Sequence, residues 1–162
     1  MRHKVVKVLP YRAEDLFTLV GDVTRYPEFV PWVTRLTASP ARADGPDADV
    51  LAAEAEVGFS FLKERFATTV RRDRAKLAIE VGLIRGPFRT LSNSWRFTPE
   101  GDGTRIDFAI DFEFKSRLLD GVLHANFDRA VGKLIACFEA RAAALQAAGV
   151  FNEPTAPPQT PV

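Results

Sequence analysis

Apolar and polar residues alternate with a period of two along the middle of the chain. The alternation runs through residues 51–61, 66–70, 77–83, 91–97 and 105–114, and turn-forming residues separate these segments. The face predicted to point inward carries Leu51, Ala53, Ala55, Val57, Phe59 and Phe61, then Phe66, Thr68 and Val70, then Leu77, Ile79, Val81 and Leu83, then Leu91, Asn93, Trp95 and Phe97, and finally Ile106, Phe108, Ile110, Phe112 and Phe114. This pattern predicts an antiparallel meander with one inner face that needs a cover.

The beginning of the chain has a different pattern. Residues 3–9 are rich in β-branched side chains and predict a first strand. Residues 13–20 have acidic residues in the first turn and apolar residues at helical spacing, so they predict a short helix. A second helical turn is expected at residues 24–29, where two prolines limit its length.

The end of the chain predicts the cover of the sheet. A long helix is expected over residues 117–147, with Ser116 as its N-cap and Gly149 at its C-terminal end. Its apolar residues recur every three or four positions: Leu123, Phe127, Val131, Leu134, Phe138, Ala142 and Leu145. The first two turns also carry Leu118, Leu119 and Val122, more apolar residues than one buried stripe needs, which favours a membrane-facing entrance or a dimer contact.

Together these elements predict an α+β protein with a helix-grip fold. We expect a curved antiparallel sheet of about six to seven strands around the long C-terminal helix, with two short helices after the first strand. Residues 1–148 form one domain, as the length of 162 residues indicates. The proline-rich residues 149–162 predict a disordered tail.

Composition and charge exclude several classes of protein. The formal net charge is +1, from 22 basic and 21 acidic residues, so no overall field favours DNA or anionic lipid. Cys137 is the only cysteine, which excludes an internal disulfide and a CxxC metal or redox site. The first residues lack the apolar core of a secretory signal, and no apolar run reaches the length of a membrane span. We expect a cytoplasmic protein with no DNA partner, at most peripheral to the inner membrane.

Several motifs resemble those of a known family. They are YPEFVPW at residues 26–32, EVGF at 56–59, ERF at 64–66, GPF at 86–88, WRFTP at 95–99, DFEF at 111–114 and ACFEARA at 136–142. Together they resemble the coenzyme-Q-binding and ribosome association toxin family of START-like proteins, which are of the polyketide cyclase/dehydrase type. Cys137 stands where this family usually has alanine. The resemblance spans residues 3–146.

This resemblance implies a function that composition and spacing alone do not. Members of the family include mitochondrial proteins that bind ubiquinone and support respiration. Others are bacterial toxins that bind the large ribosomal subunit and block its pairing with the small one. The resemblance implies non-enzymatic binding of ubiquinone or a similar isoprenoid lipid in a cavity between sheet and helix, with the quinone as a ligand and no catalytic cofactor. The alternative is a regulator of the large ribosomal subunit.

The predicted ligand-binding residues lie on the inner face of the sheet, on the long helix and in the short-helix region. They are Val30, Pro31, Trp32, Phe59, Phe61, Phe66, Val81, Leu83, Phe88, Leu91, Asn93, Trp95, Phe112, Phe114, Leu119, Leu123, Phe127, Val131, Leu134 and Phe138. Ligand cavities are mostly apolar with a few polar anchors. Each of these apolar residues has plain core packing as its alternative.

Two groups within this set have more specific alternatives. Residues 30–32 form an entrance to the cavity, or the prolines only end the helical turn and Trp32 only packs. Asn93 is an amide on an otherwise apolar face, and a buried amide without partners costs about 1–3 kcal/mol. It anchors a ligand head group, or it makes a structural hydrogen bond to protein or to buried water.

Charged residues offer weaker candidates. The basic cluster at residues 71–76 contacts ribosomal RNA phosphates or anionic lipid, or it is a solvated turn. The acidic residues Asp107, Asp111 and Glu113 share the outer face of one strand, and we expect them to pair with basic residues of neighbouring strands, namely Lys4, Lys7 or Arg96.

Signals for catalysis are sparse. His3 and His124 belong to no HxxxH or HExxH pair, and Ser92 and Ser94 lack a GxSxG elbow. His124 on the long helix contacts a quinone carbonyl or merely flanks the buried stripe. We therefore predict no enzyme, no metal and no catalytic residue, and an aromatase/cyclase-like activity rests only on analogy of fold.

Overall fold

The computed structural model describes residues 1–59 and 62–151. Its elements in chain order are β1 (Arg2–Leu9), α1 (Ala13–Gly21), the 3-10 helix η1 (Val23–Glu28), β2 (Val33–Ala38), β3 (Arg42–Ala43), β4 (Ala48–Phe59), β5 (Leu62–Asp73), β6 (Ala78–Arg85), β7 (Phe88–Glu100), β8 (Gly103–Phe114) and α2 (Arg117–Ala147). The first strand, both short helices and the long helix lie where the sequence predicts them.

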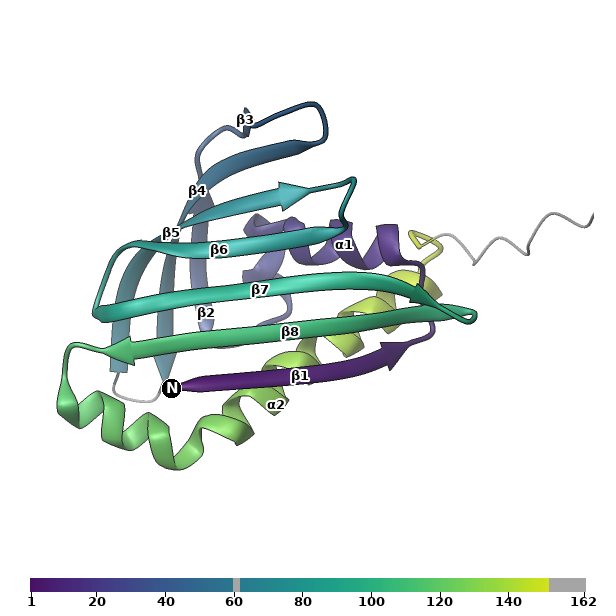
Figure 1. Cartoon of the computed structure of the whole chain (residues 1–162). Helices are drawn as coiled ribbons and strands as arrows, with labels where there is room; N and C mark the ends of the chain where they lie inside the picture. The colour runs from purple at the N-terminus through teal and green to yellow at the C-terminus, as the bar shows by residue number, and fades with distance from the viewer. Residues whose placement is uncertain (60–61, 152–162) are drawn as a thin grey trace, which may run out of the picture.

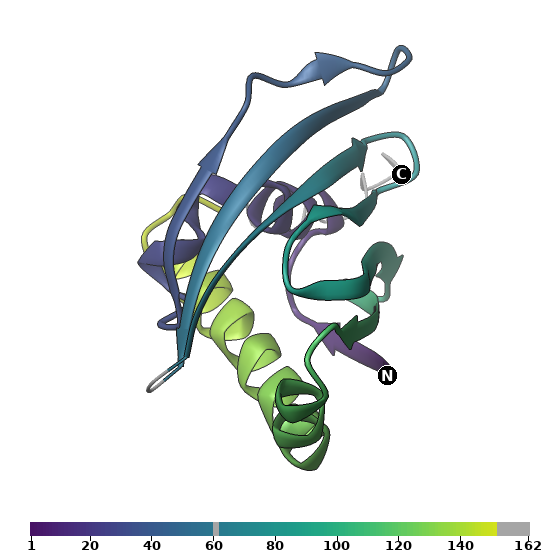
Figure 2. The same ribbon diagram turned by 90° about the vertical axis from the view of Figure 1, so that its left-hand side faces the viewer.

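The strands form one curved antiparallel sheet. Within the described residues the sheet has 8 strands in the order β1-β8-β7-β6-β5-β4-β2, and β3 pairs with β4 beside this path. Figure 1 shows α2 running across the sheet, and Figure 2 shows the sheet curving around α2 with α1 and η1 on the same concave side. This is the predicted helix-grip fold, with its long helix as the cover.

Two strands were not predicted. In β2 (Val33–Ala38) the apolar residues Val33 and Leu36 are three positions apart, because the pairing with β4 shifts register between Val33 and Arg35. Such a bulge removes the period of two that marks a strand in the sequence. The other, β3, has only 2 residues, too few to show a period of two. The main path of the described sheet thus has seven strands, which agrees with the predicted six to seven, and the two-residue β3 adds an eighth.

The long helix has the predicted ends. The Ser116 hydroxyl accepts a hydrogen bond from the Leu119 backbone N–H at 3.4 Å, as an N-cap does. After the last turn Gly149 has a φ of +74°, and its N–H donates to the Gln146 carbonyl. The buried side chains of α2 are Phe127, Val131, Ile135, Phe138 and Ala142. Their spacing places one apolar stripe against the concave face of the sheet.

The folded part extends beyond the predicted boundary at residue 148. Phe151 is buried, and its ring lies 5.9 Å from the Tyr11 ring in an edge-to-face arrangement. Phe151 therefore packs against the core although it lies in the predicted tail, while Val150 before it is 62% exposed. Residues 152–162 lie outside the described residues, so the expected disorder there stays a prediction.

The acidic strip of β8 has other partners than those predicted. The Asp111 carboxylate lies 2.9 Å from the guanidinium of Arg2, which the pairing of β1 with β8 places directly opposite. Asp107 pairs with Arg105 of its own strand at 3.1 Å. Lys7 lies two residues before the buried Leu9 and therefore on the same, inner face of β1. From there it pairs with Glu139 of α2 and does not reach the outer acidic strip. Cross-strand pairing is thus confirmed for Asp111, with Arg2 as the partner in place of Lys4 or Lys7. Arg96 lies opposite Asp107 in the register of β7 and β8, but no ion pair joins them within the described residues.

Candidate functional site

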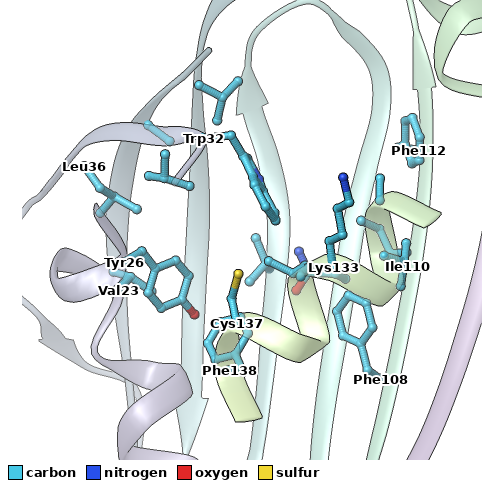
Figure 3. A pocket seen from close by; sticks show the side chains of 18 of the residues that line it. Val23, Tyr26, Trp32, Leu36, Phe108, Ile110, Phe112, Lys133, Cys137 and Phe138 are labelled. Carbon is cyan, nitrogen blue, oxygen red and sulfur yellow. The ribbon is translucent and has the colours of Figure 1, made fainter. Parts of the chain in front are cut away.

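A cavity of about 1370 Å³ lies between the concave face of the sheet and α2. Side chains from η1, β2, β4, β5, β6, β7, β8 and α2 form its walls. Figure 3 shows labelled examples from these walls, with Tyr26 and Trp32 on one side, Phe108 and Phe112 on the other, and Cys137 and Phe138 on the helix. The sheet curves away from α2 enough to leave this space unfilled by protein atoms.

Most of the predicted ligand-binding residues border this cavity. They are Pro31, Trp32, Phe66, Val81, Phe88, Leu91, Asn93, Trp95, Phe112, Phe114, Leu123, Phe127, Val131, Leu134 and Phe138. The period of two on the strands and the three-to-four spacing on α2 bring them together on facing surfaces. Whether they hold a ligand is a separate matter and stays a prediction.

Other predicted residues do not border the cavity. Val30 is fully buried, and its backbone N–H donates to the Tyr26 carbonyl at 2.8 Å, so it packs behind the wall. Leu83 lies just past Gly82, where the pairing of β6 with β7 ends, and it is not among the lining residues. Leu119 lies in the first turn of α2 and is also not among them. Phe61 and the side chain of Phe59 lie outside the described part of the chain.

One end of the cavity is bounded by aromatic rings around Phe138 of α2. The Phe138 ring lies 5.3 Å from Tyr26, 5.2 Å from Phe29 and 5.1 Å from Trp95, all measured between ring centroids. Trp95 also lies 4.4 Å from Phe108 of the adjacent strand. These edge-to-face and tilted contacts connect η1, the sheet and α2 at one point.

The other end has a second aromatic cluster, centred on Phe88. Its ring stacks on Phe114 at 4.8 Å and meets Phe66 edge-on at 5.4 Å, and Phe112 lies 4.8 Å from Phe127 of α2. Gly86 makes this cluster possible: its φ is +150°, and a Cβ atom there would come within 2.5 Å of the Phe66 Cβ. The GPF motif thus brings β6 into β7 tightly enough for Phe66 and Phe88 to touch.

Several lining residues were missed from the sequence. Those from η1, from its C-cap and from β2 include Val23, Tyr26, Phe29 and Leu36. Those from α2 include Asn126, Arg129, Ala130, Lys133, Ala136, Cys137, Ala140, Arg141 and Ala144. The α2 residues do recur every three or four positions. Because they are small or polar, a search for large apolar residues passed over them, yet the alanines are what leaves space beside the helix.

Polar groups in the cavity are few. The Asn93 Oδ1 atom is buried and has no hydrogen-bond partner among the described residues. Tyr26 donates a hydrogen bond from its hydroxyl to the Val20 carbonyl, and burial raises the pKa of this phenol, which keeps it neutral.

An ion pair at the edge of the cavity connects α2 to η1. Arg141 of α2 pairs with Glu28 of η1 at 3.1 Å and lies 5.2 Å from the centre of the Phe29 ring. The hydrogen bond from Arg25 and that from Arg141 lower the pKa of Glu28.

The residues considered for catalysis lie elsewhere. His3 borders α2 beside Phe127, with its Nδ1 2.9 Å from Asp128, and His124 is exposed outside the cavity lining. Ser92 and Ser94 are exposed on the outer face of the sheet. No group of three or more His, Cys, Asp or Glu side chains in the described ranges is placed to hold a metal ion. The arrangement can enclose an apolar molecule and offer it a few polar contacts.

Comparisons with known proteins agree with this architecture. A ribosome association toxin of Rickettsia prowazekii is 33% identical over 139 residues, covering 84% of this chain and 92% of the relative. The mitochondrial coenzyme Q-binding protein COQ10 homolog B of Xenopus laevis is 31% identical over 140 residues, covering 84% of this chain and 55% of that longer protein.

A solved structure and a family model extend the comparison. The solution structure of an 18 kDa protein of Caulobacter crescentus has 58% sequence identity and a TM-score of 0.77, covering 91% of this chain and 99% of that one. Residues 9–139 match the family described as polyketide cyclase/dehydrase and lipid transport. The chain therefore belongs to this START-like family, as its motifs indicated.

Proposed function

We propose that this protein binds ubiquinone or a similar isoprenoid lipid, carries it without changing it chemically and so supports respiratory quinone function. The observation behind this proposal is the cavity of about 1370 Å³ between sheet and α2, with aromatic clusters at both ends. Ligand pockets usually have volumes of about 300–1,000 Å³, so this one has room for a long tail. The relative named as a coenzyme Q-binding protein supports the choice of ligand.

The energetics of such binding follow from the lining. Each CH₂ group of a tail that leaves water contributes about 0.8 kcal/mol. A flexible tail fits cavities of many shapes, so the apolar wall gives affinity with little selectivity. Polar contacts must then distinguish one head group from another, and Asn93 is the candidate anchor that the sequence already indicated.

We place the protein in the cytoplasm with peripheral contact to the inner membrane, where an isoprenoid quinone resides. Among the described residues no helix is both long and apolar enough to cross a bilayer. Leu118 and Val122, which are 77% and 52% exposed at the start of α2, are the residues we propose to contact the lipid surface.

Tryptophan fluorescence tests the proposal directly. Trp32 and Trp95 are the only two tryptophans of the chain, and both border the cavity. We expect ubiquinone to quench their emission with saturation near one equivalent, and organic extracts of the purified protein to contain quinone or isoprenoid by mass spectrometry. No saturable quenching, together with lipid-free extracts after loading, would contradict the proposal.

A second candidate is binding to the large ribosomal subunit with a block of subunit association. It is favoured by the relative that is named as a ribosome association toxin. In the basic cluster, however, Arg71 pairs with Asp44 at 2.9 Å and Arg72 with Asp49 at 2.7 Å, which leaves Arg74 and Lys76 as its remaining cations. Cosedimentation with large subunits that is lost in the double variant Arg74→Ala, Lys76→Ala would support this candidate.

The proposal includes no reaction. The described lining contains no histidine or serine, so a nucleophile paired with a histidine base has no place there. Turnover of a polyketide that depended on a polar cavity residue such as Asn93 would instead support a cyclase.

A further inference from the structure

We propose that Lys133 and Arg129 of α2 form a head-group site at the side of the cavity, and that this site selects amphiphiles with an anionic head, such as a phosphate or carboxylate on an isoprenoid tail. This inference rests on the proposed binding of isoprenoid lipids. It adds a ligand class, because a quinone head is neutral and the cavity wall by itself does not distinguish charge.

The position of these two residues is the first observation. Both border the mostly apolar cavity from α2, and both are exposed rather than buried in the core. Figure 3 shows Lys133 extending from the helix toward the space between Trp32 and Phe112. A ligand that lies between sheet and helix would therefore meet the ammonium group without leaving the apolar walls.

The second observation is that these charges have no described counter-charge. Of the cations that border the cavity, Arg141 is satisfied by Glu28 at 3.1 Å, whereas neither Arg129 nor Lys133 makes an ion pair or hydrogen bond within the described residues. Glu64 of β5 is the single carboxylate of the described lining, and no ion pair of 4.0 Å or less joins it to either cation.

The helical spacing of the two cations makes an anion the natural partner. Arg129 and Lys133 are four residues apart in α2, so their side chains are neighbours on one helix face. Two like charges at this spacing destabilise a helix slightly, and a phosphate or carboxylate bound between them would relieve the repulsion. Charge-assisted hydrogen bonds to such a head are about twice as strong as those to a neutral carbonyl.

A pair of lipids with the same tail isolates the contribution of the head. We would measure tryptophan quenching or displacement of bound ubiquinone by geranylgeranyl phosphate and by geranylgeraniol, below the concentrations at which they form micelles. The expected result is that wild-type protein binds the phosphate about tenfold more tightly than the alcohol at low salt, and that salt reduces this preference.

Variants of α2 then assign the preference to residues. Lys133→Met retains the length of the apolar stem and is expected to reduce the preference for the phosphate about fivefold. The double variant Arg129→Met, Lys133→Met is expected to remove this preference. Both variants should bind the alcohol within about twofold of the wild-type affinity. The matched control is Lys4→Met, which removes the same charge from the exposed outer face of the sheet. It should leave the preference unchanged.

The outcomes separate this inference from the proposed function. If ubiquinone binds but geranylgeranyl phosphate binds no more tightly than geranylgeraniol, the head-group site is wrong and the proposed lipid binding stands. The same holds if Lys4→Met lowers the preference for the phosphate as much as Lys133→Met does. If none of the three lipids binds, both proposals fail. Inorganic phosphate added in excess should not displace ubiquinone, because without the tail it has no cavity contacts; displacement by it would show a free phosphate site instead.

Discussion

At the scale of single residues, the concave face of the sheet holds two kinds of apolar side chain. Phe97 is 2% exposed and packs edge-to-face against Phe17 of α1, so it belongs to the core. Val81 also points inward but is half-buried, because it borders the cavity. Alternation along a strand gives both residues the same direction, so the sequence predicts the face without separating core from cavity wall.

Filling the cavity should separate stability from binding. We expect Val81→Phe to leave the free energy of unfolding within about 1 kcal/mol of wild type, because the larger ring enters existing space, and to weaken ubiquinone binding at least tenfold. The control is Val20→Phe, which overpacks a site only 2% exposed and should cost about 1–3 kcal/mol. Urea denaturation and quenching titrations measure the two effects, and a destabilised Val81→Phe with unchanged binding would contradict the assignment.

Asn93 gives a second prediction at this scale. Its Oδ1 atom is buried without a described partner, and such an atom costs about 1–3 kcal/mol of stability. Asn93→Leu should therefore raise the free energy of unfolding of the ligand-free protein by about 1 kcal/mol and weaken binding of a polar head. A loss of stability in urea denaturation would show instead that the amide already has a partner, such as a buried water.

At the scale of elements, α2 and the β6–β7 hairpin carry most of the site. Both ends of the helix and most of its buried stripe were predictable, since capping and spacing are local properties of the sequence. The prediction omitted the buried Ile135 and included Leu134, which is only partly buried. The hairpin was predictable as a turn, yet the closeness of Gly86 to Phe66 depends on β5, which lies beside β6 in the sheet. Local signals thus place elements, and contacts between elements set their fine geometry.

The glycines of these two elements should respond in opposite ways. Gly132 lies inside α2, and a Cβ atom at this position would point into open space, so Gly132→Ala should stabilise the protein by about 0.5–1 kcal/mol. Gly86→Ala should cost more than about 1 kcal/mol, because its φ of +150° and the Phe66 Cβ at 2.5 Å both oppose a side chain. Thermal denaturation of both variants checks the signs, and equal effects would contradict this reading of the hairpin.

At the scale of the whole molecule, polar contacts tie the helices to the sheet. Arg72 of β5 binds Asp49 of β4 through two nitrogens at 2.7 and 2.8 Å, and it donates to the Gly21 carbonyl at the end of α1 at 3.0 Å. Across the molecule, Lys7 and His3 of β1 pair with Glu139 and Asp128 of α2. These contacts join segments far apart in the sequence.

The role of Arg72 leads to a further prediction. Arg72→Met should lower the free energy of unfolding by about 2 kcal/mol, because it removes charge-assisted hydrogen bonds that join three elements. Arg74→Ala, two positions along and exposed, should change it by no more than about 0.5 kcal/mol. Chemical denaturation gives both values. If the two variants were equally stable, the hydrogen bonds and the ion pair of Arg72 would contribute little to the free energy of unfolding.

The sequence by itself determined the class of fold, the long helix and the inner face of the central strands. Period, caps and turn residues are local, so one sequence sufficed for them. The tertiary structure decided the strand β2, whose bulge hides its period, the burial of Phe151, and the charge pairs of β1, which depend on register. It also decided the size and the walls of the cavity, which the family resemblance had only implied. Empty space arises where the curved sheet and the small residues of α2 fail to meet, and no residue type in the sequence marks that distance.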